Sequence, residues 1–419
     1  MNAKLLDSSD AFAADGPYAF RRMGISLLLA TIFNVGMWAI IVVLPSVQSD
    51  FGMNRGGASL PYSLTMFGLA FGAVTLGRLA DRIGFAAPLA IAGLAQGAGF
   101  IVAGFAPNIA VFDAAHLLLI GPGAGIAFGP LMADVSHWFV KRRGFAVVVV
   151  ASGNYLAGVI WPLAIEAGLV PLGWRGVYFA IGAVVLGGAL PLAALMRRRP
   201  SEATMRRADA QSEVARADIG VSPRALVWML VLAGFACCTA MSMPQVHLVA
   251  YCGDLGYGVA VGAEMLSLML GLGIISRLAS GALADRIGSI ATLALGSFMQ
   301  GLALLLYTAF NGLTSLFVVS GVFGLFQGGI VPMYAIICRE LLPPREAGAY
   351  IGLVVAATTF GMAFGGYASG LIFDLTGSYR IAFLNGVAWN VVNFAIVCWL
   401  LWRRRRARVE AVGAAAPAK

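Results

Sequence analysis

The sequence predicts an all-α integral membrane protein with twelve transmembrane helices arranged as two six-helix bundles. The composition supports this fold class, because 60% of the 419 residues are hydrophobic, only 11% are charged and the mean hydropathy is +0.87. Soluble globular domains lie far from these values. Apolar segments long enough to cross a hydrocarbon core of roughly 30 Å also recur along the chain. They are residues 24–46, 58–76, 87–105, 110–133, 145–167, 175–196, 225–248, 259–283, 290–310, 313–337, 348–371 and 380–402.

The two halves of the chain repeat each other in the same orientation. GRLADRIG at 77–84 returns as GALADRIG at 281–288, a displacement of 204 positions. Such a parallel repeat is expected of two bundles related by an axis along the membrane normal. The predicted organisation is a tail (1–23), an N-terminal six-helix bundle (24–196), a polar linker (197–224), a C-terminal six-helix bundle (225–402) and a second tail (403–419).

The basic residues predict the orientation in the membrane. If the amino terminus is inside, 24 of the 28 Lys and Arg residues fall in cytoplasmic segments, as the positive-inside rule requires. We therefore predict a multi-pass protein of the cell inner membrane with both termini cytoplasmic. The net charge of +9 then reflects topology rather than a nucleic-acid partner. The linker supports this, since its charges are not interleaved with aromatic residues.

One arginine lies inside an apolar helix. Arg277 is the charged residue of the segment 266–284, and the nearest carboxylate along the chain, that of Asp285, is two turns away. A guanidinium near the bilayer centre costs about 2.5 to 3.5 kcal/mol on insertion scales, so such a residue is a site hypothesis by default. Two alternatives stay open. Arg277 could extend toward the cytoplasmic face, or it could bond to backbone carbonyls at a helix kink.

The repeated motif has the form G-x-L-x-D-R-x-G, and its charged residues predict a short loop between two spans in each half. Its residues are Gly77, Asp81, Arg82 and Gly84 in the first half, and Gly281, Asp285, Arg286 and Gly288 in the second. With twelve spans and a central charged linker, the chain resembles the major facilitator superfamily of secondary transporters. The resemblance implies that Asp81 docks near the start of helix eleven and locks the cytoplasmic side. The alternative is a loop whose charges only set the topology.

Within that superfamily, residues 244–277 resemble the monocarboxylate porters and their oxalate/formate antiporter relatives. The shared element is PQVHLVAYCGDLGY followed by an apolar stretch and an arginine. The resemblance implies that Arg277 binds the substrate carboxylate. Two departures matter: Gly273 stands where animal monocarboxylate porters carry an aspartate, and 353–370 lacks the lysine of the oxalate-type antiporters. One cationic site favours a monoanion over a dianion.

Other polar residues lie in the middle of predicted spans and are candidate substrate contacts. They are Asn34, Trp38, Asn154, Tyr155, Gln327, Tyr334 and Thr358. Asn154 and Tyr155 align with Thr358 and Thr359 at the repeat displacement, so both halves present polar groups from equivalent helices, which fits a site at the repeat interface. A hydrogen bond between helices is the alternative role for each of them. His247 is the candidate proton carrier, against the alternative of a structural histidine.

These observations predict a secondary transporter that moves a small organic anion, a monocarboxylate, by alternating access. Transport of this anion could be coupled either to a proton or to a counter-anion. The competing hypotheses are an oxalate/formate-type antiporter, an exporter of amphipathic compounds and a membrane sensor that does not transport. An enzyme is not expected, and neither a cofactor nor a metal is, because the sequence has no phosphate-binding loop, no HExxH and no GxSxG. The sequence does not indicate the substrate's identity, the direction of transport or the oligomeric state.

Overall fold

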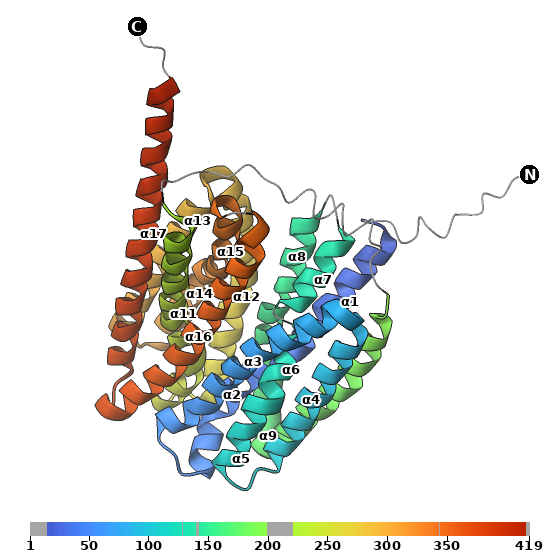
Figure 1. The fold of residues 1–419 in the computed structure, drawn as a ribbon. Helices are drawn as coiled ribbons and strands as arrows, with labels where there is room; N and C mark the ends of the chain where they lie inside the picture. The colour runs from blue at the N-terminus through green and yellow to red at the C-terminus, as the bar shows by residue number, and fades with distance from the viewer. Residues whose placement is uncertain (1–14, 128, 140–141, 199–220, 343, 416–419) are drawn as a thin grey trace, which may run out of the picture. The chain divides into compact units, whose positions relative to one another are not determined.

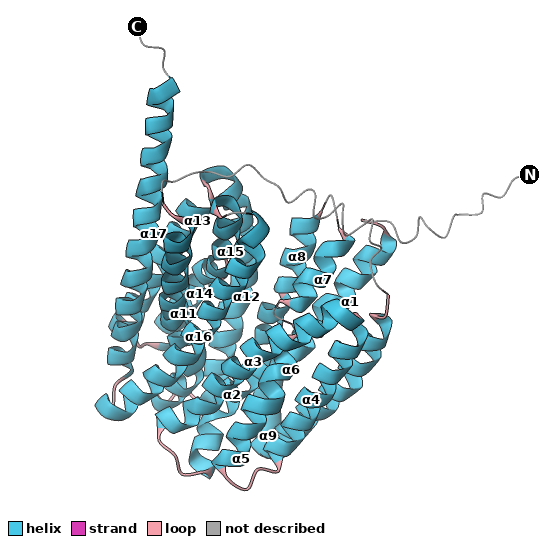
Figure 2. Cartoon of the chain, in the orientation of Figure 1, coloured by secondary structure: helices cyan, strands magenta, loops and turns pink. Residues whose placement is uncertain are grey.

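A computed structural model describes residues 15–127, 129–139, 142–198, 221–342 and 344–415. The described residues form helices and short connections, with no strand among them (Figure 2). The predicted tail 1–23 is described only from residue 15, and most of the linker 197–224 lies outside the described residues.

The helices of the first half follow one another in the order of Figure 1. They are α1 (Pro17–Phe33), α2 (Val35–Asp50), α3 (Arg55–Ile83), α4 (Ala86–Gly104), α5 (Ile109–Ala115), the π-helical turn η2 (His116–Ile120), α6 (Gly121–Gly125), α7 (Pro130–Trp138), α8 (Arg143–Ala151) and α9 (Gly153–Leu195). Those of the second half are α11 (Pro223–Asp254), α12 (Val259–Ile287), α13 (Ser289–Ala309), α14 (Leu313–Gln327), α15 (Ile330–Leu341), α16 (Pro344–Thr376) and α17 (Tyr379–Ala415).

The described helices include 11 runs that are long and apolar enough to cross a membrane. One of them, Gly144–Leu195, is 52 residues long. At 1.5 Å per residue it would reach about 80 Å, more than twice the thickness of a hydrocarbon core. It contains the predicted span 145–167 and all but the last residue of the span 175–196. Its helix is interrupted at Gly173, where φ is 63° and ψ is 171°. This run therefore accounts for two of the twelve predicted crossings.

Glycines make equivalent turns in both repeats. Gly173 and Gly377, displaced by 204 positions, have φ values of 63° and 65°, and a Cβ at either would meet nothing within 4 Å. Gly84 and Gly288 have φ values of 89° and 90° and follow α3 and α12. Residues with a Cβ rarely adopt these angles, so glycine is needed for the backbone rather than for space.

Contacts divide the chain into two compact units. The first, unit 1, contains 1–47 and 64–213, and the second, unit 2, contains 48–63 and 214–419. Within the predicted N-terminal bundle, 24–196, residues 48–63 are assigned to unit 2 rather than to unit 1. The end of α2 and the first turns of α3 belong to unit 2.

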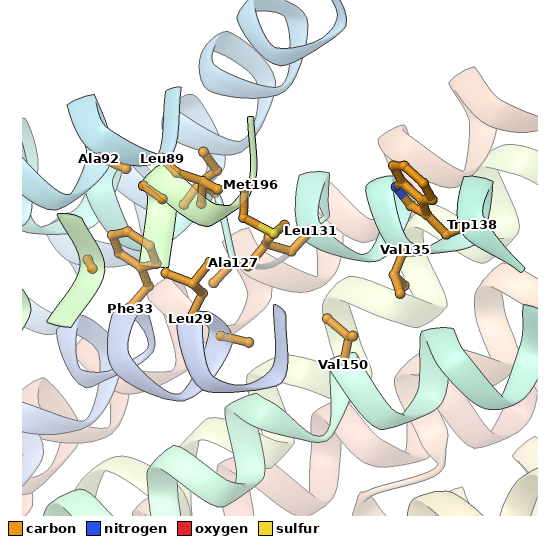
Figure 3. Packing of buried hydrophobic residues seen from close by; sticks show 14 of the residues in the cluster. Leu29, Phe33, Leu89, Ala92, Ala127, Leu131, Val135, Trp138, Val150 and Met196 are labelled. Atoms are coloured by element: carbon orange, nitrogen blue, oxygen red, sulfur yellow. The ribbon is translucent and has the colours of Figure 1, made fainter. Parts of the chain in front are cut away.

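Unit 1 packs α1 against α4, α7, α8 and the end of α9. Figure 3 shows Leu29 and Phe33 of α1 gathered with Leu89 of α4, while Val135 and Trp138 of α7 lie further along the same cluster. The cluster extends to Met196 just after α9. These side chains are almost fully buried, so they form a continuous apolar core.

Unit 2 packs its helices through glycines. A Cβ at Gly324 of α14 would collide with the backbone of α12 at Met269, and one at Gly328, just after α14, would collide with it at Gly273. A Cβ at Gly361 of α16 would collide with the backbone of α11. Without a side chain, the two backbones approach closely, as in the small-xxx-small packing of membrane helices.

Candidate functional site

Arg277 lies on α12 and is partly buried. Its Nε donates a hydrogen bond to the carbonyl oxygen of Gly328 at 3.2 Å. Gly328 and Gly329 separate α14 from α15. The second alternative left open by the sequence, a bond to a backbone carbonyl at a helix break, is therefore present in the structure.

The sequence explains why the carbonyl of Gly328 is available. In a continuous helix it would accept a hydrogen bond from the backbone N–H four residues later. That position is occupied by Pro332, which has no N–H. The proline thus leaves an acceptor in the span, and Arg277 donates to it.

A buried pair of amides lies beside this contact. Gln245 of α11 donates from Nε2 to Oε1 of Gln327 at 2.7 Å, and the two residues are 2% and 0% exposed. Among the described residues, the remaining amide atoms, Oε1 of Gln245 and Nε2 of Gln327, have no hydrogen-bond partner. Gln327 precedes Gly328 in the chain, so the amide pair adjoins the acceptor of Arg277. Three helices, α11, α12 and α14, contribute to this cluster.

Gln245 was not among the predicted site residues. The sequence signal for it is an amide directly after Pro244 in an otherwise apolar span. What a single sequence does not show is that Gln245 faces Gln327, which lies 82 positions away.

The other candidates of unit 2 have local or structural partners. Tyr334 donates from its hydroxyl to Oδ1 of Asn393 at 2.6 Å, and Asn393 donates to the Ser297 hydroxyl at 2.8 Å. Thr358 and Thr359 donate to a carbonyl of their own helix, that of Val355. The structure therefore joins Gln327 to the neighbourhood of Arg277 and directs the hydroxyl of Tyr334 toward α17.

His247 is fully buried in α11. Its Nε2 lies 2.8 Å from the carbonyl oxygen of Gly366, and its Nδ1 lies 3.4 Å from the hydroxyl of Tyr379. Because the ring contacts an acceptor through Nε2, that nitrogen carries the proton in this arrangement. The ring thus links α11 to α16 and α17.

The candidates of unit 1 form one direct contact. The indole Nε1 of Trp38 donates to the backbone carbonyl and to Oδ1 of Asn154, at 3.1 and 3.2 Å. Asn34 donates to the carbonyl of Ala30 at 2.7 Å, whereas its Oδ1 has no partner among the residues described. Tyr155 is buried next to Asn154 in the sequence. Trp38 and Asn154 thus join α2 to α9.

The two G-x-L-x-D-R-x-G motifs lie at helix ends. Most of each motif forms the last turns of α3 or α12, because intrahelical bonds continue to Gly84 and Gly288. Arg82, Asp285 and Arg286 are exposed, whereas the side chain of Asp81 lies outside the described residues. A Cβ at Gly77 would approach Pro130 at 3.3 Å, whereas Gly281 has open space around it.

The all-helical architecture and its membrane-crossing runs define a polytopic membrane protein. The profile of the Major Facilitator Superfamily matches residues 26–313 and 265–418. The chain belongs to this family. Its members and relatives are transporters, so the protein is a secondary transporter and not an enzyme.

Several curated relatives are similar over most of the chain. Monocarboxylate transporter 13 of Rattus norvegicus is 26% identical over 82% of this chain and 78% of its own length. The probable sulfoacetate transporter SauU of Cupriavidus necator is 23% identical over 86% and 89% of the two chains. The uncharacterized MFS-type transporter YcxA of Bacillus subtilis is 25% identical over 85% and 89%.

Solved structures share the fold at low identity. A POT family transporter in complex with 5-aminolevulinic acid has a TM-score of 0.71 at 11% identity and covers 92% of this chain and 96% of its own. A bacterial homolog of the human lysosomal transporter Spinster has a TM-score of 0.67 at 15% identity and covers 94% and 97%. At such identities the likeness supports the fold alone.

Proposed function

We propose that this transporter moves a small organic monoanion, a monocarboxylate, by alternating access, and that Arg277 binds the carboxylate. The observation that carries the proposal is the placement of Arg277 beside the break between α14 and α15, with Nε bonded to Gly328. That bond fixes the orientation of the guanidinium. A planar guanidinium suits a carboxylate, since it can donate two parallel hydrogen bonds.

The surroundings of Arg277 favour a small substrate with further polar groups. The amide pair of Gln245 and Gln327 offers one donor and one acceptor that the described residues do not satisfy. Buried polar groups are costly when unpaired, so a substrate that supplies hydrogen bonds here would be favoured over an apolar acid. We therefore include Gln245 and Gln327 in the proposed binding site. Asn34, Trp38, Asn154, Tyr155, Tyr334 and Thr358 remain further candidates.

The relatives support an organic acid as the substrate class. Two of them carry the names monocarboxylate transporter and sulfoacetate transporter. The stretch 353–370 of this chain has no basic residue, so Arg277 is the proposed anchor and a monoanion is the preferred charge state. We also propose the predicted topology, an inner-membrane protein with cytoplasmic termini, two bundles at 24–196 and 225–402, and a cytoplasmic linker.

The test is uptake of labelled carboxylates into proteoliposomes that contain purified protein. Wild type should accumulate at least one monocarboxylate. Arg277→Lys should lower the rate of uptake at least tenfold, because the point charge of lysine cannot donate the two parallel hydrogen bonds of a guanidinium. Arg277→Leu should abolish uptake. Arg380→Leu, which removes a cation at the first residue of the predicted span 380–402, is the matched control.

Ligand-induced thermal stabilisation, measured on the same variants, separates binding from flux. A ligand at 100 times its Kd raises the free energy of unfolding by about 2.7 kcal/mol. Stabilisation without uptake or counterflow would indicate a sensor. Full uptake by folded Arg277→Leu protein would refute the assignment of Arg277.

A further inference from the structure

The first two turns of α3 pack tightly on α16 within unit 2. The hydroxyl of Ser63 donates to the carbonyl of Ala363 at 2.6 Å. A Cβ at Gly370 would approach Oγ of Ser59 at 2.7 Å and the carbonyl oxygen of Arg55 at 3.0 Å. As residue numbers rise along α3 they fall along α16, so the two segments are antiparallel and their backbones nearly touch.

The amino terminus of α3 is capped by a side chain 319 positions away. The backbone N–H of Arg55 donates to Oδ1 of Asp374 at 2.7 Å, and that of Gly56 donates to Oδ2 at 2.6 Å. The first N–H groups of a helix have no partner in their own helix, and the macrodipole favours an anion there. A Cβ at Gly56 would lie 2.9 Å from Oδ2 of Asp374, so glycine lets the carboxylate approach.

The side chain of Arg55 makes a second connection, to the end of α11. Its Nη2 lies 2.9 Å from both carboxylate oxygens of Asp254. Arg55 is 6% exposed, and its guanidinium carbon lies 5.3 Å from the ring centre of Phe373 and 6.0 Å from that of Tyr379. One residue of α3 thus joins the ends of α11 and α16 through its backbone and its side chain.

The internal repeat does not reproduce these contacts at the equivalent positions of the other half of the chain. At the displacement of 204 positions, Asp254 corresponds to Asp50, but Arg55 corresponds to Val259 and Asp374 to Val170. The second copy therefore lacks both the cation and the capping acid. The charges are a separate feature of α3 and α16 rather than a property of the repeated unit.

We propose that Asp374, Arg55 and Asp254 form a latch that holds the start of α3 in unit 2 and breaks each time the transporter opens on that side. In the proposed topology this is the side opposite the cytoplasm. The inference rests on the proposed function only in assuming alternating access. Breaking the latch releases two N–H groups and a guanidinium, all of which water can solvate once the segment separates, so the contact can form and break repeatedly.

The test measures how often the buried face beneath the latch opens. Ser59 is fully buried against α16. Ser59→Cys therefore provides a thiol that reacts only when the first turns of α3 separate from α16. The rate of alkylation is measured in purified full-length protein by mass spectrometry. The backgrounds are wild type, Asp374→Ala, Arg55→Met and the matched control Glu264→Gln, which removes an exposed acid near the start of α12.

The latch predicts that alkylation of the introduced cysteine rises at least tenfold in Asp374→Ala and in Arg55→Met and stays unchanged in Glu264→Gln. A tenfold change corresponds to about 1.4 kcal/mol. The buried native cysteines Cys237 and Cys238 report global unfolding in the same samples. An unchanged rate in both latch variants would overturn the proposal. An equal rise at Cys237 and Cys238 would do the same, because it would mean general destabilisation.

This readout needs no substrate. Absence of carboxylate uptake by the wild-type protein would therefore contradict the proposed function and leave the labelling result intact. A failed labelling test would leave Arg277 and its uptake assay unaffected.

Discussion

Arg22 and Asp134 form a bidentate salt bridge inside unit 1, in which Nε of Arg22 lies 2.7 Å from Oδ2 of Asp134 and Nη2 lies 2.8 Å from Oδ1. Both side chains are 1% exposed. Arg22 also donates to the carbonyl of Arg198 at 2.9 Å and lies over the ring of Trp138. The start of α1 is thereby tied to α7 and to the chain that follows α9.

Removing one member of this pair should destabilise the fold strongly. Asp134→Asn is expected to lower the free energy of unfolding by roughly 3 to 5 kcal/mol, because it leaves a buried guanidinium without its counter-charge. The double variant Arg22→Met with Asp134→Leu should recover much of the loss, since no charge then remains buried. The measurement is thermal unfolding in detergent. Equal melting temperatures for Asp134→Asn and wild type would contradict the expectation.

Pro332→Ala tests the origin of the contact made by Arg277. Alanine supplies the N–H that proline lacks, so the Gly328 carbonyl gains a helical donor that competes with Arg277. Carboxylate affinity should fall roughly fivefold, the effect of a hydrogen bond worth about 1 kcal/mol. Pro162→Ala, inside α9, is the matched control. Equal affinity in the two variants would show that the break does not orient the arginine.

The amide pair allows a stability test that is separate from transport. Gln245→Leu and Gln327→Leu should each lower the free energy of unfolding by about 1 to 3 kcal/mol, because each leaves a buried amide without its partner. The double leucine variant should unfold at a temperature close to wild type, yet still lose uptake if the amides contact substrate. Normal uptake in that variant would remove them from the site.

The gating role of Asp81, the acid of the first G-x-L-x-D-R-x-G motif, remains a prediction. If Asp81 locks the cytoplasmic side, Asp81→Asn should fold normally and shift the protein toward the inward-facing state. Accessibility of cysteines placed at the cytoplasmic helix ends measures the shift, and Asp285→Asn is the repeat-matched control. Unchanged accessibility together with lost expression would support the topological role instead.

Proton coupling is tested at His247. His247→Gln retains a donor for the Gly366 carbonyl, so the fold should survive. If His247 carries the proton, uptake by the variant should lose its dependence on an imposed pH gradient. The same dependence in variant and wild type would exclude His247 as the proton carrier. The test matters because Gly273 stands where animal monocarboxylate porters carry an acid.

The fold follows from the sequence because bilayer thickness dictates the length of each apolar run. The all-α membrane fold and the membership of the family were predicted and are confirmed. The helical position of the G-x-L-x-D-R-x-G residues was not predicted, since the charged residues suggested a loop. Helical hydrogen bonds continue until a glycine with positive φ ends them.

The contacts of the candidate site were harder to predict. Pro332 indicates that a carbonyl is available four residues earlier, but not which side chain uses it. The partners of Arg55 lie 199 and 319 positions away. A single amino-acid sequence carries no signal that links residues so far apart. A cation near a helix start has the sequence pattern of an ordinary surface charge. The role of Arg277 remains a prediction.

The turns at Gly173 and Gly377 have a consequence for natural variation. Neither position has a neighbour within 4 Å of where a Cβ would lie, so a Cβ would meet no steric obstacle at either position. The φ values of 63° and 65° are nevertheless rarely adopted by residues that carry a Cβ. In a saturation mutagenesis library selected for a folded product, these two sites should therefore favour glycine strongly, although an added Cβ would meet no neighbouring atom. Selection would then retain glycine at these two positions because of backbone conformation, as it retains apolar residues in the core because of packing.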